Sequence, residues 1–227
     1  MLIRLTSGNV DFAAFKTDGT DIRFAKPNGS PLPYEIEQWD ASMGPAQKFD
    51  GQSEYFQMTG TASGKLNFPQ NSVYAISAWA LTDTLDGHYH TIASKGDFQY
   101  NLELIKSNYW QFAEFNPGVG WDVATFPATA KTWTYVTGIR NGKSKYLYVN
   151  GSLADSTIEI TPDTVNPWKS NFDFMIGKIE KSPTDTISYF FKGMIDEVRI
   201  TSTVPNADWV KLCYMNQRPD DKLVRVK

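Results

Sequence analysis

The chain has 227 residues, of which 41% are hydrophobic and 21% are charged, a composition that is ordinary for a globular protein. Its net charge is −3 and it has no basic run to neutralise phosphates, which argues against a nucleic-acid partner. No segment approaches the roughly 20 apolar residues of a membrane span, and the first residues lack the apolar region of a signal peptide. The lone cysteine, Cys213, excludes an internal disulfide and a cysteine-based zinc site, and we expect it to be a small buried apolar residue.

The first 43 residues form a distinct opening that we predict to be a β fragment. Short strands are indicated at residues 2–6, 22–25 and 33–39, and the Asn28-Gly29 pair before the last of them is a strong hairpin signal. About 40 residues rarely bury enough apolar surface to fold alone. We therefore expect this fragment to pack on the domain that follows it, or to add strands to that domain.

Residues 44–227 show a regular succession of short strands separated by turns. The strands are predicted at residues 72–81, 91–95, 100–105, 110–115, 133–140, 145–149 and 173–177. The clearest hairpin turns at Asn141-Gly142. In its second strand Leu147 and Val149 share one face, and two tyrosines share the other.

The chain ends with one more predicted strand and one predicted helix. Residues 191–200 are rich in β-branched residues, although Asp196 and Glu197 lie inside this strand, where a metal ion, a salt bridge or solvent must satisfy them. Helical spacing is found only at residues 206–214. The whole pattern predicts an all-β fold, a two-sheet antiparallel sandwich with one short C-terminal helix.

Three motifs in this part of the chain are typical of a known family. They are Phe-Asp-Gly-Gln-Ser-Glu-Tyr at residues 49–55, Ile-Ser-Ala-Trp at residues 76–79 and Gly-Met-Ile-Asp-Glu-Val-Arg at residues 193–199. They resemble strands of LamG-like (concanavalin A-like) jelly-roll domains. The resemblance covers roughly residues 44–217 and implies that the first and last strands pair in one sheet. It says little about function, because the same architecture serves lectins, carbohydrate-binding modules, hydrolases and adhesion domains.

The opening segment carries a second resemblance. Residues 4–7, 18–24 and 32–40 are similar to the head of a bacterial domain of unknown function that accompanies LamG-like modules in secreted proteins, including polysaccharide-degrading systems. This resemblance implies an extracellular or cell-surface location, and a place within a larger multidomain protein.

Carboxylates near the two expected neighbouring strands predict a cation site. Calcium takes oxygen ligands from carboxylates and backbone carbonyls. Lectins and hydrolases of this fold often carry a structural calcium between the first and last strands, so the resemblance implies Asp50 and Asp196 as ligands, with the Gly51 carbonyl. The alternative is that Asp50 caps its own turn and Asp196 pairs with an arginine or lysine.

The high aromatic content, 14% with seven Trp and eleven Tyr, favours a sugar-binding face. Sugars present apolar ring faces and hydroxyl groups, which aromatic rings flanked by carboxylates or amides recognise. The expected ligand-binding residues are Trp110, Trp121, Tyr100, His90 and Glu114. The alternative is that Trp110 and Tyr100 belong to the core, whereas Trp121 follows a glycine-rich loop and is expected to be exposed.

Catalysis has weaker support in the sequence. The Glu-x-Asp-x-Glu strand of laminarinase-like hydrolases is absent, and Glu103 and Glu114 are isolated carboxylates on neighbouring predicted strands. The two histidines, His88 and His90, are too few for a metal-hydrolase cluster. We therefore expect a non-catalytic carbohydrate-binding module of a secreted bacterial polysaccharide-degrading or cell-surface system. The alternatives are a glycoside hydrolase or polysaccharide lyase on the same fold, and a structural or adhesion module that binds protein.

Overall fold

The computed structural model of the chain describes residues 46–60, 64, 66–68, 72–96, 99–116, 120–158, 172–179 and 189–217. The chain divides into two units, and the description below concerns the unit Ala46–Met215. The predicted N-terminal fragment at residues 1–43, with the motifs found in it, lies outside the described residues.

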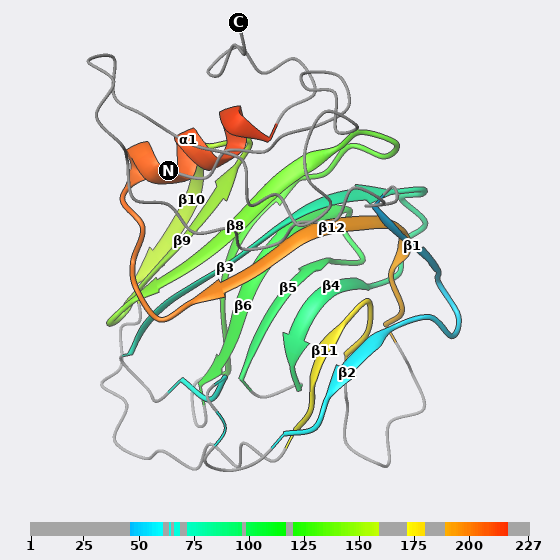
Figure 1. The fold of residues 1–227 in the computed structure, drawn as a ribbon, viewed down its shortest axis with the longest axis horizontal. Helices are drawn as coiled ribbons and strands as arrows, with labels where there is room; N and C mark the ends of the chain where they lie inside the picture. Colours follow the sequence, from blue (N-terminus) through cyan, green and yellow to red (C-terminus); the bar gives the residue numbers. More distant parts are fainter. Residues whose placement is uncertain are drawn as a thin grey trace, which may run out of the picture. The chain divides into compact units, whose positions relative to one another are not determined.

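Two antiparallel sheets of six strands each make up the described fold (Figure 1). The first sheet has the order β1-β12-β3-β8-β9-β10, with the bounds Gln47–Asp50, Lys192–Thr201, Val73–Thr82, Thr134–Asn141, Ser144–Val149 and Ser152–Ile158. The second has the order β2-β11-β4-β5-β6-β7, with the bounds Phe56–Met58, Phe174–Ile176, His90–Lys95, Tyr100–Leu104, Tyr109–Asn116 and Gly120–Pro127. The predicted all-β two-sheet sandwich is confirmed.

The helix α1 (Ala207–Asn216) covers the outer face of the first sheet (Figure 1). It begins after Asn206, whose side-chain Oδ1 accepts the backbone N–H three residues on at 2.8 Å, as a helix N-cap does. Cys213, buried as expected, packs in one cluster with Trp79 and Tyr135 of the sheet. In the described part of the chain, no helix has the length and apolar character needed to cross a membrane.

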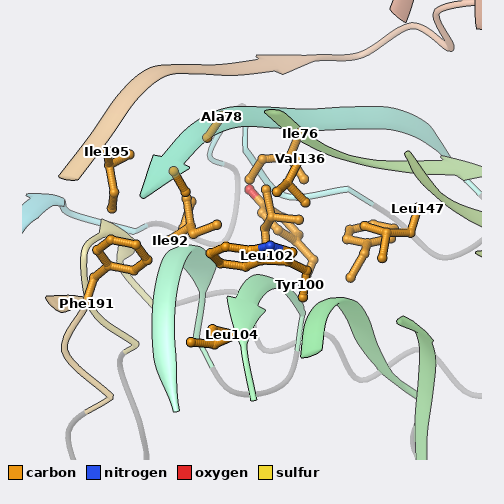
Figure 2. Packing of buried hydrophobic residues seen from close by; sticks show 14 of the residues in the cluster. Ile76, Ala78, Ile92, Tyr100, Leu102, Leu104, Val136, Leu147, Phe191 and Ile195 are labelled. Carbon is orange, nitrogen blue, oxygen red and sulfur yellow. The ribbon is translucent and has the colours of Figure 1, made fainter. Parts of the chain in front are cut away.

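The main core lies between the two sheets (Figure 2). The side chains come from strands of both sheets and from Phe191, just before β12. The labelled members of the cluster are Ile76, Ala78, Ile92, Tyr100, Leu102, Leu104, Val136, Leu147, Phe191 and Ile195. Most of them alternate along their strands with residues that point outward, because successive side chains point to opposite faces of a sheet.

The predicted pairing of the first and last strands is also confirmed. In the β1–β12 ladder Gln47 lies opposite Ile195, and Phe49 lies opposite Gly193. A Cβ atom at Gly193 would lie 2.0 Å from the Leu81 carbonyl oxygen of β3, so only glycine fits at this close approach of the backbones.

The edge strands β7 and β10 meet along one side of the sandwich. The backbone N–H of Thr125 on β7 donates to Asp155 Oδ2 on β10 at 2.8 Å. A register shift between Leu153 and Asp155 marks a bulge in β10 at this point. These contacts form a seam between the two sheets.

Candidate functional site

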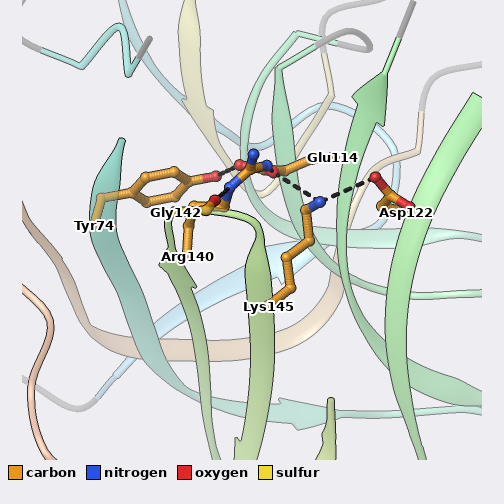
Figure 3. A network of polar contacts seen from close by, with 6 residues as sticks. All are labelled: Tyr74, Glu114, Asp122, Arg140, Gly142 and Lys145. Atoms are coloured by element: carbon orange, nitrogen blue, oxygen red, sulfur yellow. Dashed lines mark hydrogen bonds and ion pairs between the residues drawn. The ribbon is translucent and has the colours of Figure 1, made fainter. Parts of the chain in front are cut away.

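Glu114 is the centre of a polar network that joins the two sheets (Figure 3). Its carboxylate, on β6, accepts hydrogen bonds from the Tyr74 hydroxyl on β3 and from the Arg140 guanidinium on β8. Lys145 Nζ on β9 lies 3.3 Å from Glu114 Oε2 and 3.1 Å from Asp122 Oδ2 on β7. Two cations of the first sheet thus face two carboxylates of the second.

The charges of this network are buried as well as paired. The side chains of Arg140 and Lys145 are 5% and 0% exposed, and that of Glu114 is 9% exposed. Burial of a charge is costly unless a partner and hydrogen bonds compensate it, and here each charge has an opposite partner. Burial also raises the pKa of Tyr74 well above its ordinary value. Glu114 therefore holds the sheets together and does not face solvent, where a sugar-binding carboxylate would have to lie.

Two of the aromatic residues predicted for the sugar face lie in the core instead. Trp110 and Tyr100 are each 1% exposed, and both belong to the cluster between the sheets. The Tyr100 hydroxyl donates to the backbone oxygen of Leu66 at 3.2 Å, which satisfies its polar atom inside the protein. Neither ring presents a face to a ligand in this arrangement, which agrees with the alternative interpretation of these two residues.

His90 is also buried, and both of its ring nitrogens face acceptors. Nδ1 lies 3.0 Å from the Phe190 carbonyl oxygen, and Nε2 lies 3.0 Å from Asp86 Oδ1. A neutral imidazole has one donor, so both contacts are hydrogen bonds only when the ring is protonated. Burial opposes ionisation of Asp86, but hydrogen bonds from the His90 side chain and the His88 backbone outweigh it and lower the pKa of Asp86 to about 2. The ring nitrogens of His90 thus contact Phe190 and Asp86 inside the protein and do not face a ligand.

Asp50, predicted as a calcium ligand, caps its own turn. Its Oδ1 accepts the backbone N–H groups of Ser53, Gln52 and Glu54 at 2.8, 2.7 and 3.2 Å, and its Oδ2 accepts the Ser53 hydroxyl at 2.8 Å. The hydrogen bonds from Ser53 and Gln52 hold the pKa of Asp50 well below its ordinary value. Gly51, at φ +77°, takes the left-handed conformation that the turn requires. This geometry agrees with the alternative interpretation, in which Asp50 caps its own turn.

The register of β1 and β12 separates Asp50 from Asp196. Asp50 lies opposite Lys192, whereas Asp196 is one residue beyond Ile195, which lies opposite Gln47. Four positions along a strand correspond to roughly 13 Å. The two carboxylates are therefore near opposite ends of the ladder.

The acidic residues of β12 accept hydrogen bonds from groups of the same strand. Asp196 Oδ1 accepts the backbone N–H of Glu197 at 2.9 Å, and Glu197 Oε2 accepts Arg199 Nη2 at 2.7 Å. Glu197 itself has a φ of 52°, within the bulge between Asp196 and Arg199. Among the described residues no group of three or more His, Cys, Asp or Glu side chains could hold a metal ion. A calcium ion shared by Asp50, Gly51 and Asp196 remains a prediction that this arrangement does not favour.

The two isolated carboxylates Glu103 and Glu114 lie on opposite faces of the second sheet. Glu103 neighbours the core residues Leu102 and Leu104 in sequence and therefore points away from the core, whereas Glu114 points into the network described above. The β5–β6 register places Glu103 opposite Gln111 and Tyr100 opposite Glu114. These two carboxylates cannot act on one glycosidic bond from its two sides.

One accessible part of the second sheet's outer face lies on β6 and β7. Because Phe112 and Ala124 are core residues and face each other in the ladder, the residues next to them point outward. We call the following six outward residues the β6–β7 strip: Tyr109, Gln111, Phe115, Trp121, Val123 and Thr125. Trp121 is 43% exposed, which agrees with the expectation from sequence.

An aromatic pair and a polar pair make up most of the strip. The rings of Phe115 and Trp121 lie edge to face, with centroids 5.3 Å apart, so Phe115 supports one side of the exposed indole. The amide of Gln111 donates to Glu103 Oε1 at 3.2 Å and lies opposite Thr125 in the ladder. The strip thus offers an exposed ring and, four residues along the ladder, an amide and a hydroxyl. These groups are chemically suited to a ligand with apolar faces and hydroxyl groups.

Sequence reasoning found Trp121 but missed its neighbours in the strip. Alternation in residues 110–115 indicates two faces, and the predicted site took the face of Trp110 and Glu114, which is the buried one. The signal for the other face was present in Phe115, which has the parity opposite to Trp110. The period alone does not tell which face meets solvent.

The family model of the concanavalin A-like lectin/glucanases superfamily matches residues 50–211. The chain belongs to this superfamily. The resemblance stated from the three motifs is thereby confirmed, although the resemblance of the N-terminal segment is not tested by the match. A comparison with curated protein sequences found no match.

Several solved structures share the superfamily fold with this chain at low identity. The binding domain of botulinum neurotoxin serotype D has a TM-score of 0.55 and 14% identity, over 75% of this chain and 42% of its own. A Bacteroides ovatus protein proposed to bind carbohydrate has a TM-score of 0.55 and 20% identity, over 73% of this chain and 45% of its own. This chain therefore spans less than half of either protein.

A third similar structure matches over nearly equal shares of both chains. Domain 4 of an extracellular arabinanase from Geobacillus stearothermophilus, solved in complex with arabinotriose, has a TM-score of 0.54 and 21% identity, over 76% of this chain and 77% of its own. At these identities the likeness establishes the fold alone.

Proposed function

We propose that this chain is a non-catalytic carbohydrate-binding module, and that the β6–β7 strip is the surface that holds the sugar. The observation that carries the proposal is Trp121, a large aromatic side chain that is 43% exposed and supported by Phe115. An exposed ring of this size leaves apolar surface in water, and a sugar ring stacked on it removes that surface.

The polar residues further along the strip from Trp121 suit the same ligand. Gln111 and Thr125 supply an amide and a hydroxyl on the outward face, and Glu103 fixes the Gln111 amide from the neighbouring strand. Directed polar groups near an apolar platform give orientation and specificity to a binding site. Glu103 acts in this proposal as a positioning residue.

The proposal also includes the location of the protein and the kind of protein to which the module belongs. Two of the similar proteins are connected with carbohydrate by their descriptions, and one of them belongs to an extracellular enzyme. Together with the resemblance of the N-terminal segment, this supports a module of a larger, extracellular or cell-surface bacterial protein. Its partner is a polysaccharide or oligosaccharide of a secreted polysaccharide-degrading or cell-surface system.

Polysaccharide retention combined with an assay of reducing-sugar release tests the proposal. The protein is incubated with glucans, xylans, arabinans, mannans and pectins, and bound protein and released sugar are measured together. We expect retention by at least one polymer without release of sugar. Release would instead support a hydrolase, eliminative cleavage with an unsaturated product would support a lyase, and neither binding nor release would support a protein-binding adhesion module.

Trp121→Ala and Trp209→Ala form a matched pair of variants for this assay. Both indoles are similarly exposed, at 43% and 41%, but Trp209 lies on α1 over the other sheet. Loss of a stacked ring worth about 1–3 kcal/mol weakens binding roughly ten- to hundredfold. We expect that loss for Trp121→Ala only, with both variants melting like the wild type. Equal retention of the two variants would contradict the assignment of the strip.

A further inference from the structure

The outward positions of β6 and β7 carry no charge. The six residues of the strip are uncharged, and so are Ala113 and Pro127, which complete the outward rows of the ladder. These two strands do contain Glu114 and Asp122, but both carboxylates reach the interior, where Arg140 and Lys145 hold them. The outward side chains of these two strands are therefore neutral, although the strands themselves contain charged residues.

Among the described residues, two carboxylates contact the strip: Asp155 accepts the backbone N–H of Thr125, and Glu103 accepts the amide of Gln111. Glu103 is 4% exposed, and its carboxylate accepts hydrogen bonds from Gln111 at 3.2 Å and Thr91 at 3.4 Å. A ligand carboxylate or sulfate placed on Gln111 would compete with the Glu103 carboxylate for the same amide. It would also meet no lysine or arginine on the outward rows of β6 and β7, so it would lose hydration without gaining a counter-charge.

The strip is long, with an exposed aromatic side chain at each end. Phe115 pairs with Trp121 at one end of the ladder, and Tyr109, which is 38% exposed, pairs with Pro127 at the other. Six residues of antiparallel strand separate the two ends by roughly 20 Å. Val123 and the pair formed by Gln111 and Thr125 lie between them. A single sugar ring can contact only one end, whereas a chain laid along the strands can contact both.

We propose that the ligand class is an uncharged, extended polysaccharide chain that lies along β6 and β7, with one part of the chain on Trp121 and another on Tyr109. This inference rests on the proposed function and narrows it in two respects, the charge and the length of the ligand. It excludes uronic-acid polymers and sulfated glycans as the preferred ligands, and it excludes recognition of a single terminal sugar.

Titration calorimetry with a length series of uncharged oligosaccharides tests the inference. Disaccharides to hexasaccharides derived from the polymer retained best, or from xylan, arabinan, glucan and mannan in turn, are compared with oligogalacturonates of equal length at low and high sodium chloride. We expect affinity for the uncharged series to rise at least tenfold from disaccharide to hexasaccharide and to be insensitive to salt, because no ion pair forms. Oligogalacturonates should bind at least tenfold more weakly.

Variants at the two ends of the strip test whether the ligand spans the length of the strip. Tyr109→Ala should reduce affinity for the hexasaccharide severalfold and leave the disaccharide bound at Trp121 unaffected, whereas Trp121→Ala should weaken both. Trp209→Ala is the control and should match the wild type with every ligand. Thermal melts of each variant verify that the sheet remains intact.

The possible failures of this experiment are distinguishable. Tighter, salt-sensitive binding of oligogalacturonates would overturn the uncharged ligand while the carbohydrate-binding function stands. Equal affinity for all lengths, or an unchanged Tyr109→Ala, would overturn the extended ligand and again leave the function standing. No binding of any glycan by correctly folded protein would overturn the function itself and this inference with it.

Discussion

Glu114 Oε2 on β6 lies 3.3 Å from Lys145 Nζ on β9, and this contact crosses the interior from one sheet to the other. Arg140 contacts the same oxygen from β8, so one carboxylate forms ion pairs with two cations. The network specifies how the two sheets align at this end of the sandwich, because apolar side chains alone tolerate several alignments whereas buried charges tolerate few.

Removal of the charge on Glu114 should destabilise the protein substantially. Glu114→Gln leaves Arg140 and Lys145 buried with Asp122 as the remaining carboxylate of the network, and breaking a buried pair in this way costs about 3–5 kcal/mol of unfolding free energy. Tyr74→Phe removes one hydrogen bond from the same carboxylate and should cost about 1 kcal/mol. Urea unfolding of both variants measures the difference. A Glu114→Gln variant no less stable than Tyr74→Phe would show that the network is energetically unimportant.

The two tryptophans of the predicted sugar face should respond oppositely to truncation. Trp110→Ala opens a cavity between the sheets and should lose about 3–5 kcal/mol of stability, whereas Trp121→Ala on the surface should stay within about 0.5 kcal/mol of the wild type. Thermal melts and urea unfolding report this directly. The prediction fails if Trp121→Ala melts as early as Trp110→Ala, since Trp121 would then be a packing residue.

The interaction of Asp86 with the histidines should make stability depend on pH in the acid range. The pKa of Asp86 is lowered to about 2 in the folded protein from an ordinary 3.8. A carboxyl group with a depressed pKa contributes stability above its unfolded pKa, and that contribution is lost as the pH falls through the folded value. We expect the stability difference between wild type and Asp86→Asn to shrink as the pH falls from about 4 to about 2. A difference that is independent of pH over this range would contradict the assignment.

Chelation distinguishes the two interpretations of Asp50. If Asp50 and Asp196 hold calcium, a chelator lowers the melting temperature and Asp196→Ala abolishes that response. The hydrogen bonds of Asp50 to its own turn favour the other result. We expect no response of the wild type to chelator, and a lower melting temperature for Asp50→Ala at any calcium concentration. A calcium-dependent melting temperature would restore the metal site.

The sequence predicted the parts of the fold that depend on neighbours in the chain. The Asn141-Gly142 signal located the hairpin of β8 and β9 within one residue. In the structure Asn141 pairs with Ser144, so Gly142 and Lys143 form the turn, and Gly142 supplies the positive φ of 60° that a tight turn needs. Alternation placed Leu147 and Val149 on one face, and the structure shows that this face is the core. The pairing of β1 with β12 came from family resemblance, since no local signal links strands so far apart.

The candidate site was only partly predictable for a related reason. The partners of Glu114 are Tyr74, Arg140 and Lys145, which are 26 or more residues away in the chain and belong to the other sheet. No pattern in the sequence of β6 predicts these partners. A carboxylate among aromatic residues is therefore equally compatible with a sugar site and with a buried ion network. The packing between the sheets determines which of the two it forms.

The contact between Thr125 and Asp155 has a consequence for the protein in concentrated solution. Edge strands present unpaired N–H and C=O groups to which another chain can add, and such addition leads to aggregation. Asp155 occupies one N–H of the edge strand β7, and the bulge beside it bends the edge strand β10 out of the flat form that favours addition. These two edge strands thus shield each other, which lowers the tendency of this side of the sandwich to pair edge to edge with a second copy at high protein concentration.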